Sequence, residues 1–468
     1  MKVRVIVLAM IMALLTSVMA VSAQDDIGTI ADIVVAQAEE GEFTILLAAV
    51  QAADPAVLEA LAGDDELTVF APTDAAFSAV PEFVIEYLLG NPDLLTQVLL
   101  YHVVPGTVMS EDVVGLLEEN EGMFTVGSMD MGNELTVAAT DMGVSIDQAN
   151  LNMEMLDITA SNGVVHVIDS VLVPPITLPT VDPSTVTGDF VSAGSSTVGP
   201  LTQAIADDFI AAGYADTYTN AITGSSAGFE RFCVNGETDF SNASRPIRDS
   251  EIEDCNAIGI DPIEIRVGTD ALAVVVNSEN DFATDVTTEE LALIFSTATT
   301  WSDVRSEWPA EEIIRYIPGT DSGTFDYFAE EIFDEDTAPL LAASNVNPNE
   351  NDDVLVAGVQ DNPFAVGFFG YAFYIQNEET LNVLSIDGVE PNQASVDAAT
   401  YPLARPLFVY ADAGIIMEKP QVGSFLSYYL SNVNNVIGDV GYFPANEFAL
   451  NFAKLEILAL TDGMMEGM

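Results

Sequence analysis

The chain has 468 residues, 49% of them hydrophobic, and its 74 acidic residues outnumber 11 basic ones, for a formal net charge of −63. A surface this acidic repels polyanions, so nucleic acids and anionic membranes are excluded as partners. The length suits about two to four domains. The acidity fits high salt or a setting rich in divalent cations, where the repulsion is screened, and the sequence leaves the two settings open.

The N-terminus has the pattern of a secretory signal peptide over residues 1–23. Lys2 and Arg4 precede an apolar run over 5–15, and the small residues at 21–23 match a signal-peptidase site. The run is too short for a membrane span, which needs about 18 apolar residues. We therefore expect cleavage near Ala23 and a mature chain that is secreted, periplasmic or at the cell surface.

The only two cysteines, Cys233 and Cys255, lie close together in the sequence. In an exported protein, such a pair predicts one disulfide that closes a modest loop. By the loop-entropy argument, this disulfide would stabilise the fold by roughly 3 kcal/mol.

A proline-rich segment at 174–188 separates two units. The first unit spans 24–173, the second spans 189–450, and a tail follows at 451–468. The first unit has helical patterns followed by short alternating runs, which is typical of an α+β domain. Its expected elements are helices over 30–38, 43–52 and 55–62, a strand over 67–70, a short helix capped by Thr73 or Asp74, further helix to about 102, and a small sheet within 122–173.

Three motifs of the first unit resemble signatures of the fasciclin domain. The stretch TVFAPTDAAF at 68–77 is similar to the first signature, YHVVPG at 101–106 to the central Tyr-His motif, and NGVVHVID at 162–169 to the second signature. The resemblance covers nearly the whole unit. It implies an extracellular module for adhesion or matrix contact, without enzymatic activity.

His102 and His166, the only histidines, both lie in these motifs. With carboxylate partners they could ligate a metal. Buried histidines more often hold loops in place by hydrogen bonds. We interpret both as structural and expect neither a metal nor a cofactor.

The second unit alternates strands and helices, which predicts one or two doubly wound sheets with the ligand at the carboxyl ends of the strands. Two apolar strands, near 271–277 and 406–410, are expected to cross between two lobes as hinges. Helices are expected over 201–212, 229–233, 289–295, 325–333 and 421–430.

Three segments rich in Ser, Thr and Gly each precede an expected helix of this unit: GSST at 194–197, GSSAG at 224–228 and DSGT at 321–324. Free backbone N–H groups, the positive end of the helix dipole and nearby hydroxyls together favour an anion. A single segment of this kind is usually an ordinary helix cap. Three in one unit, with NASRP at 242–246 between them, predict convergence on one oxyanion.

Most of this unit resembles the phosphate-binding periplasmic proteins of ABC importers, the PstS family. The resemblance implies a two-lobed α/β periplasmic-binding-protein fold (type II) that captures inorganic phosphate and passes it to ABC permease and ATPase subunits. The similar stretches are 193–198, 236–247, 270–277, 301–305, 319–328, 367–372 and 405–410.

The resemblance also implies the phosphate contacts, with Thr197 acting through its hydroxyl and backbone N–H. Many members carry Arg where this chain has Pro318, so Arg245 is the expected replacement cation, and its alternative is an ion pair with a surface carboxylate. Asp321 is the expected acceptor of the phosphate proton, which would exclude sulfate; its alternative is a helix cap. The predicted site comprises Ser196, Thr197, Ser225, Ser244, Arg245, Asp321, Ser322, Gly323 and Thr324.

The segment at 224–228 also fits the Gly-x-Ser-x-Gly elbow of hydrolases, but both histidines lie upstream in the other unit, so no catalytic base follows it. No nucleotide-binding loop occurs either. We therefore predict an exported, non-enzymatic protein that captures phosphate for an ABC importer, with a fasciclin module that adheres to a surface or matrix polymer. Adhesion or phosphate sensing without transport, and capture of another oxyanion, remain open alternatives.

Overall fold

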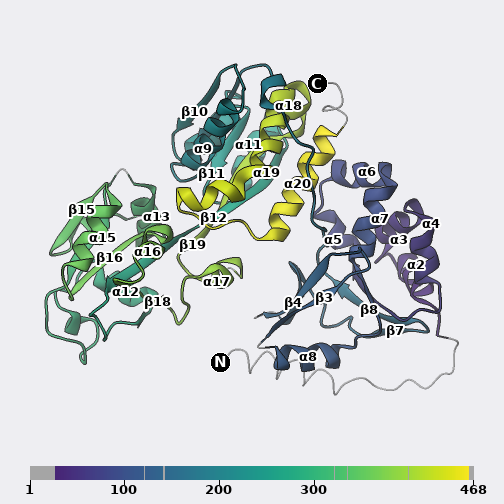
Figure 1. Ribbon diagram of the computed structural model, residues 1–468, viewed down its shortest axis with the longest axis horizontal. Coiled ribbons are helices and arrows are strands. Elements are labelled where there is room, and N and C mark those ends of the chain that lie inside the picture. Colours follow the sequence, from purple (N-terminus) through teal and green to yellow (C-terminus); the bar gives the residue numbers. More distant parts are fainter. Residues whose placement is uncertain are drawn as a thin grey trace. The chain divides into compact units, whose positions relative to one another are not determined.

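The computed structural model describes residues 27–120, 122–140, 143–320, 322–334, 336–398 and 400–462. The chain divides into two compact units (Figure 1): one comprises the residues up to Thr177 together with Lys454–Ala459, and the other comprises Leu178–Ala453 and the residues from Leu460. The expected signal peptide lies outside the described residues. Over the described ranges, no helix has both the length and the hydrophobicity that a membrane span requires.

The helices of the first unit begin at the capping residues that the sequence supplies. Thr29 and Asp32 form a capping box, and Asp54 caps the helix that starts with Pro55. Of the two candidate caps of the short helix, Thr73 is the one that caps it. The helices are α2 (Ile30–Glu40), α3 (Thr44–Ala52), α4 (Pro55–Leu61), α5 (Asp74–Ser78), α6 (Glu82–Gly90), α7 (Pro92–Tyr101) and α8 (Ser110–Glu119). All except α8 were expected.

The strands of the first unit form two four-stranded sheets. One has the order β2 (Val103–Pro105), β1 (Leu67–Pro72), β8 (Gly163–Ile168), β7 (Ile158–Ala160), and the other has the order β3 (Met123–Gly127), β4 (Glu134–Thr140), β5 (Gly143–Ile146), β6 (Ala149–Asn150). The parallel pairing of β1 with β8 brings the two signature motifs side by side. A Cβ at Gly163 would lie 1.8 Å from the carbonyl oxygen of Leu67, so this approach requires glycine.

One nine-stranded sheet runs through the second unit, where the sequence predicted one or two sheets. Its order is β10 (Tyr218–Ile222), β9 (Phe190–Gly194), β11 (Phe240–Ala243), β19 (Ala404–Asp412), β12 (Pro262–Asn277), β16 (Ala365–Gly370), β14 (Ile314–Pro318), β15 (Val346–Asn349), with β17 (Leu381–Val383) also paired to β12. A separate two-stranded sheet joins β13 (Asp285–Val286) to β18 (Ser385–Ile386).

The helices define two lobes on either side of the central strands β12 and β19 (Figure 1). The first lobe contains α9 (Val198–Ala211), α10 (Ser225–Phe229), the π-helical turn η3 (Glu230–Val234), α11 (Asp249–Ala257), α18 (Ala413–Glu418) and α19 (Pro420–Val440). The second contains α12 (Thr288–Ile294), the turn η4 (Trp301–Asp303), α13 (Gly323–Phe333), α14 (Ala338–Ala342), α15 (Asp352–Gln360), α16 (Tyr371–Ile375) and α17 (Gln393–Asp397).

The two strands that were predicted to cross between the lobes do so. Strand β12 is 16 residues long, and its second half is buried without interruption. It pairs with β19 in antiparallel register through most of its first half, with a bulge between Arg266 and Gly268. Its second half pairs with β16 of the second lobe. Both lobes are therefore built on the same strand.

The C-terminal segment differs from the expected tail. Helix α20 (Glu447–Thr461) continues through much of 451–468. Ala453, Leu455 and Ile457 are almost completely buried. Burial of these apolar side chains stabilises a helix where the sequence analysis expected a tail.

Candidate anion-binding site

The first predicted loop follows β9 at the carboxyl edge of the sheet. Gly194 lies so close to β11 that a Cβ there would be 2.0 Å from the carbonyl oxygen of Asn242. The hydroxyl of Ser195 accepts hydrogen bonds from the N–H groups of Thr197 and Val198, at 3.1 and 3.2 Å. The N–H of Thr197 was expected to bind the anion, but it already donates to Ser195. The hydroxyl of Thr197 accepts a hydrogen bond from Arg405.

The second loop meets the first at the same edge of the sheet. The N–H groups of Thr223 and Gly224 both donate to the carbonyl of Gly194 at 2.9 Å. Helix α10 then begins at Ser225, whose hydroxyl lies 3.3 Å from that of Ser244 and accepts the Ser244 N–H at 3.2 Å. Strands β9, β10 and β11 are parallel, and the carboxyl ends of parallel strands are where open α/β sheets bind ligands.

The third loop comes from the second lobe and contacts the first loop directly. Ser322 caps α13 by accepting the N–H of Thr324 at 3.2 Å. A Cβ on Gly323 would lie 2.8 Å from the hydroxyl of Ser196 and 3.0 Å from that of Thr197. A side chain at position 323 would therefore have to displace these two hydroxyls. Asp321, the expected proton acceptor, lies outside the described residues.

A buried ion pair that the sequence analysis did not assign lies at this meeting point. Arg405 Nε and Nη2 each donate to Asp270 Oδ2 at 3.1 Å, and Nη2 also reaches Thr197 Oγ1 at 2.7 Å and the carbonyl of Gly323 at 3.3 Å. The guanidinium lies 4.0 Å from the centre of the Tyr327 ring. Arg405 therefore connects the loops of both lobes.

The burial of this pair sets its electrostatics. Asp270 is 2% exposed and Arg405 is 8% exposed. Burial raises the pKa of Asp270, and the charge and hydrogen bonds of Arg405 act in the opposite direction. Because charges interact more strongly away from water, hydrogen bonds to an anion at this position are stronger than on the open surface.

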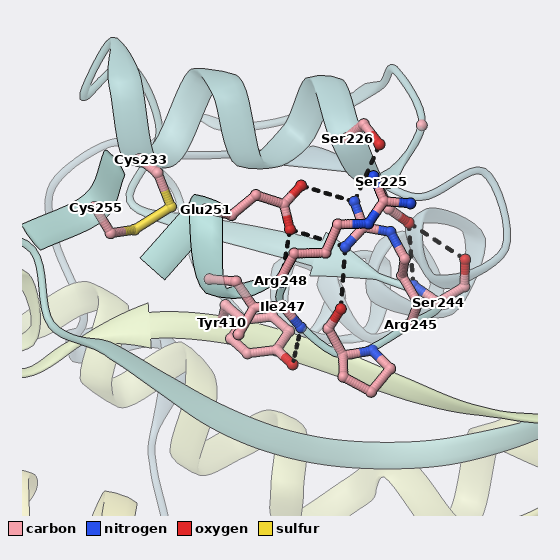
Figure 2. A network of polar contacts seen from close by, with 12 residues as sticks. Ser225, Ser226, Cys233, Ser244, Arg245, Ile247, Arg248, Glu251, Cys255 and Tyr410 are labelled. Atoms are coloured by element: carbon pink, nitrogen blue, oxygen red, sulfur yellow. Dashed lines mark hydrogen bonds and ion pairs between the residues drawn. A yellow bond between two sulfur atoms is a disulfide. The ribbon is translucent and has the colours of Figure 1, made fainter. Parts of the chain in front are cut away.

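Arg245 lies in the alternative arrangement that the sequence left open, an ion pair (Figure 2). Its Nη1 and Nη2 donate to the two carboxylate oxygens of Glu251 at 2.8 and 2.7 Å, and further to the carbonyl of Pro246 and the hydroxyl of Ser226, both at 3.0 Å. Burial alone would raise the pKa of Glu251, but hydrogen bonds from Arg245 and Arg248 lower it below its ordinary value. A phosphate contact by Arg245 stays a prediction.

The predicted disulfide between Cys233 and Cys255 is confirmed. It connects the turn η3 to helix α11, which also carries Glu251 (Figure 2). The crosslink therefore fastens the helix whose carboxylate holds Arg245.

Arg405 and Asp270 both lie in stretches that carry the family resemblance, yet the sequence analysis gave them no role. A charge inside an apolar strand must be paired when it is buried. The pair could have been predicted from the sequence, because one crossing strand carries an acid, Asp270, and the other carries an arginine, Arg405. In the structure the two residues are direct cross-strand partners of β12 and β19.

In the first unit, both histidines have the structural role that was expected. His102 Nδ1 donates to the carbonyl of Val98 at 2.7 Å, and Nε2 accepts the N–H of Leu172 at 2.9 Å. His166 Nε2 donates to the carbonyl of Val108 at 2.8 Å. Burial lowers the pKa of His102 to about 4 and also lowers that of His166.

Two lobes that share crossing strands, with loops meeting at the sheet edge, define a two-lobed ligand-binding protein. The PBP superfamily domain matches residues 180–433, and the fasciclin domain matches residues 41–174. The chain belongs to the PBP superfamily and carries a fasciclin domain ahead of its PBP superfamily domain.

Similar proteins cover the second unit. Protein SphX of Synechococcus elongatus is 41% identical over 263 residues, which is 54% of this chain and 76% of that protein. Phosphate-binding protein PstS of Staphylococcus saprophyticus is 33% identical over 277 residues, 58% of this chain and 85% of that protein. The crystal structure of a possible phosphate binding protein from Planctomyces limnophilus is 35% identical with a TM-score of 0.54, covering 59% of this chain and 99% of that one.

Proposed function

We propose that the second unit captures inorganic phosphate between its lobes. The observation that carries this proposal is the close approach of Gly323, at the start of α13 in the second lobe, to the hydroxyls of Ser196 and Thr197 in the first lobe. Arg405 lies at the same point. Similarity to a phosphate-binding protein supports phosphate as the anion.

The chemistry of the loops fits a tetrahedral dianion. Hydroxyls can donate to its oxygens, and the start of α13 adds free N–H groups and the positive end of a helix dipole. Donors from two lobes also enclose the anion, so binding favours lobe closure, and exclusion of water strengthens each hydrogen bond. The proposed hydroxyl donors are those of Ser196, Thr197, Ser225, Ser244, Ser322 and Thr324.

Selectivity for phosphate over sulfate is assigned to Asp321. Hydrogen phosphate has a proton to donate near neutral pH, and sulfate has none. A carboxylate facing the anion accepts that proton and repels sulfate. Replacing Asp321 with Asn should weaken phosphate binding and relax the rejection of sulfate, as measured by competition between the two anions.

The binding test is calorimetric titration of the full mature chain with phosphate and, separately, sulfate, at low and high salt. We expect one phosphate per chain and little sulfate binding. Thr197→Val should weaken phosphate binding by about 10-fold or more, because the substitution removes one buried hydroxyl. Thr219→Val on the exposed side of β10 is the matched control. No phosphate binding in either salt would overturn the proposal and leave adhesion as the leading function.

The broader role proposed here is delivery of phosphate to an ABC permease and its ATPase in the membrane, with the fasciclin domain retaining the protein at the cell surface. Support comes from the combination of a fasciclin domain and a PBP superfamily domain in one chain. Deleting residues 24–173 should release the protein from cells while phosphate binding persists. Unchanged cell association would contradict retention by this domain, and unchanged phosphate uptake after loss of the whole chain would contradict transport.

A further inference from the structure

We propose that Arg405 supplies the guanidinium that contacts the bound anion, and that Asp270 is the residue that positions it. The proposal rests on the proposed function and deepens it, because it names the cation of the site. It assigns the contact to a strand residue at the crossing between the lobes and not to Arg245 in the loop after β11.

Arg405 has N–H groups that no described residue accepts. A guanidinium has five N–H donors, of which one is on Nε and two are on each terminal nitrogen. In Arg405, Nε and Nη2 contact Asp270, Thr197 and Gly323. Nη1 has no hydrogen bond to any residue in the described ranges, although Arg405 is 8% exposed. Among the described residues, Nη1 is not one of the buried polar atoms that lack a partner, so solvent reaches it. Its two N–H groups are therefore the ones available to an anion.

Arg405 also lies where the loops of the two lobes meet. Nη2 of Arg405 is 2.7 Å from the hydroxyl of Thr197, a residue of the first loop. The same nitrogen is 3.3 Å from the carbonyl of Gly323, where the second lobe arrives. The guanidinium is therefore at the junction where an anion held by both lobes would be bound.

The side chain of Arg405 is held in place by its neighbours. Asp270 and Arg405 are cross-strand partners of β12 and β19, so backbone pairing fixes their separation. The ring of Tyr327 covers one face of the guanidinium at 4.0 Å. A donor held in this way loses little conformational freedom when the anion binds.

In Arg245, by contrast, the terminal N–H donors already have acceptors. Its two terminal nitrogens carry four N–H donors, and four acceptor contacts account for them: two to Glu251, one to Ser226 and one to Pro246. Arg245 must break its ion pair with Glu251 before its terminal nitrogens can bind an anion. Arg405 needs no such rearrangement.

The experiment is calorimetric titration of the full mature chain with inorganic phosphate, repeated on matched variants. Arg405→Gln combined with Asp270→Asn removes both buried charges at once, which avoids an unpaired charge. This double variant should bind phosphate about 100-fold more weakly, the loss expected for strong hydrogen bonds to a charged group. Asp270→Asn alone keeps the guanidinium and should lose less affinity. Arg231→Gln, in an exposed ion pair with Glu237, is the control and should bind as the parent does.

The outcomes separate this inference from the proposed function. Arg405→Lys keeps the charge but not the fork, so it should fold, as judged by near-UV circular dichroism, and still bind at least about 10-fold more weakly. Parent-like affinity in the folded double variant or in Arg405→Lys would overturn the inference and leave the proposed function intact. A larger loss for Arg245→Gln than for the double variant would also overturn it. Failure of the parent chain to bind phosphate would overturn both.

Discussion

Arg315 and Arg405 are both buried in the second unit, yet their surroundings differ. Arg315 is 0% exposed, and its guanidinium donates to the backbone carbonyls of Ile294, Ile313, Ala298 and Ser344. Burial without a compensating charge lowers the pKa of Arg315 to about 10. Arg405 instead pairs with a carboxylate and a hydroxyl and keeps Nη1 without a partner among the described residues.

The difference teaches that burial alone does not separate a structural arginine from a binding one. The two kinds of arginine differ in the number of N–H donors that have no acceptor within the protein. Arg315 joins the end of α12 to neighbouring segments and has little left to offer a ligand. By the same criterion the histidines of the first unit are structural, as Arg315 is. Both ring nitrogens of His102, for example, have hydrogen-bond partners in the backbone.

The strongest test of this comparison is Arg315→Met. The substitution leaves several buried carbonyls without donors, each at a cost of about 1–3 kcal/mol, so we expect a loss of at least about 4 kcal/mol in unfolding free energy. Both tryptophans, Trp301 and Trp308, belong to the second unit. Their fluorescence during guanidinium unfolding measures that loss. A loss below about 1 kcal/mol, the range of surface substitutions, would contradict a structural role.

The next effect is acid destabilisation of the first unit through His102. Its folded pKa of about 4 is below the ordinary value of 6.5. The unfolded chain therefore takes up a proton first, so the stabilisation is complete above pH 6.5 and is lost as pH falls towards 4, in total on the order of 3 kcal/mol. Amide hydrogen exchange of the first unit as a function of pH tests this. His102→Gln should flatten the profile, and an unchanged slope would contradict the assignment.

The disulfide should contribute a comparable amount to the second unit. Replacing Cys233 and Cys255 together with Ala removes the crosslink between η3 and α11, for a loss of about 3 kcal/mol by loop entropy. Tryptophan fluorescence in guanidinium measures it. Reduction of the parent chain should reproduce the loss, and a reductant should have no effect on the double variant.

The smallest expected effect on stability is that of Glu251→Gln, which tests whether Arg245 is structural. Its ion pair with Glu251 is only partly buried, so Glu251→Gln should cost less than about 1 kcal/mol. The variant also removes the negative charge that pairs with Arg245. Unchanged phosphate affinity would agree with a satisfied, structural Arg245. Affinity that rises by about threefold or more, a difference of well under 1.4 kcal/mol, would show that the freed guanidinium can reach the anion.

Much of the fold could be predicted from local patterns. Helical spacing located six helices of the first unit and, in the second unit, α9, α12, α13 and α19, but not α11, α14 to α18 or α20. Thr73 was one of two candidate caps, and the cysteine pair was recognised as a disulfide. These features depend on residues that are near one another in the chain. Helix α8 was not among the expected elements, although it buries Val113 and Leu117.

The cation of the site was harder to predict. Arg245 stands beside a proline in a loop that resembles a binding motif, and its sequence surroundings do not show that Glu251 occupies its donors. Arg405 and Asp270 are 135 residues apart. Their contact depends on the register between β12 and β19, which is set by long-range packing and not by local pattern. Asp321 was predicted from its motif alone and stays a prediction.

The crossing of β12 and β19 has a mechanical consequence. In the described part of the sheet, every hydrogen-bonded path from β9–β11 to β14–β16 passes through these two strands. A rotation of one lobe against the other must therefore twist the ladder in which Asp270 and Arg405 face each other. Because backbone pairing fixes the separation of these two residues, the strands carry the charge pair with them when they twist. A spectroscopic label on either lobe would therefore report the twist of the strands that hold the pair.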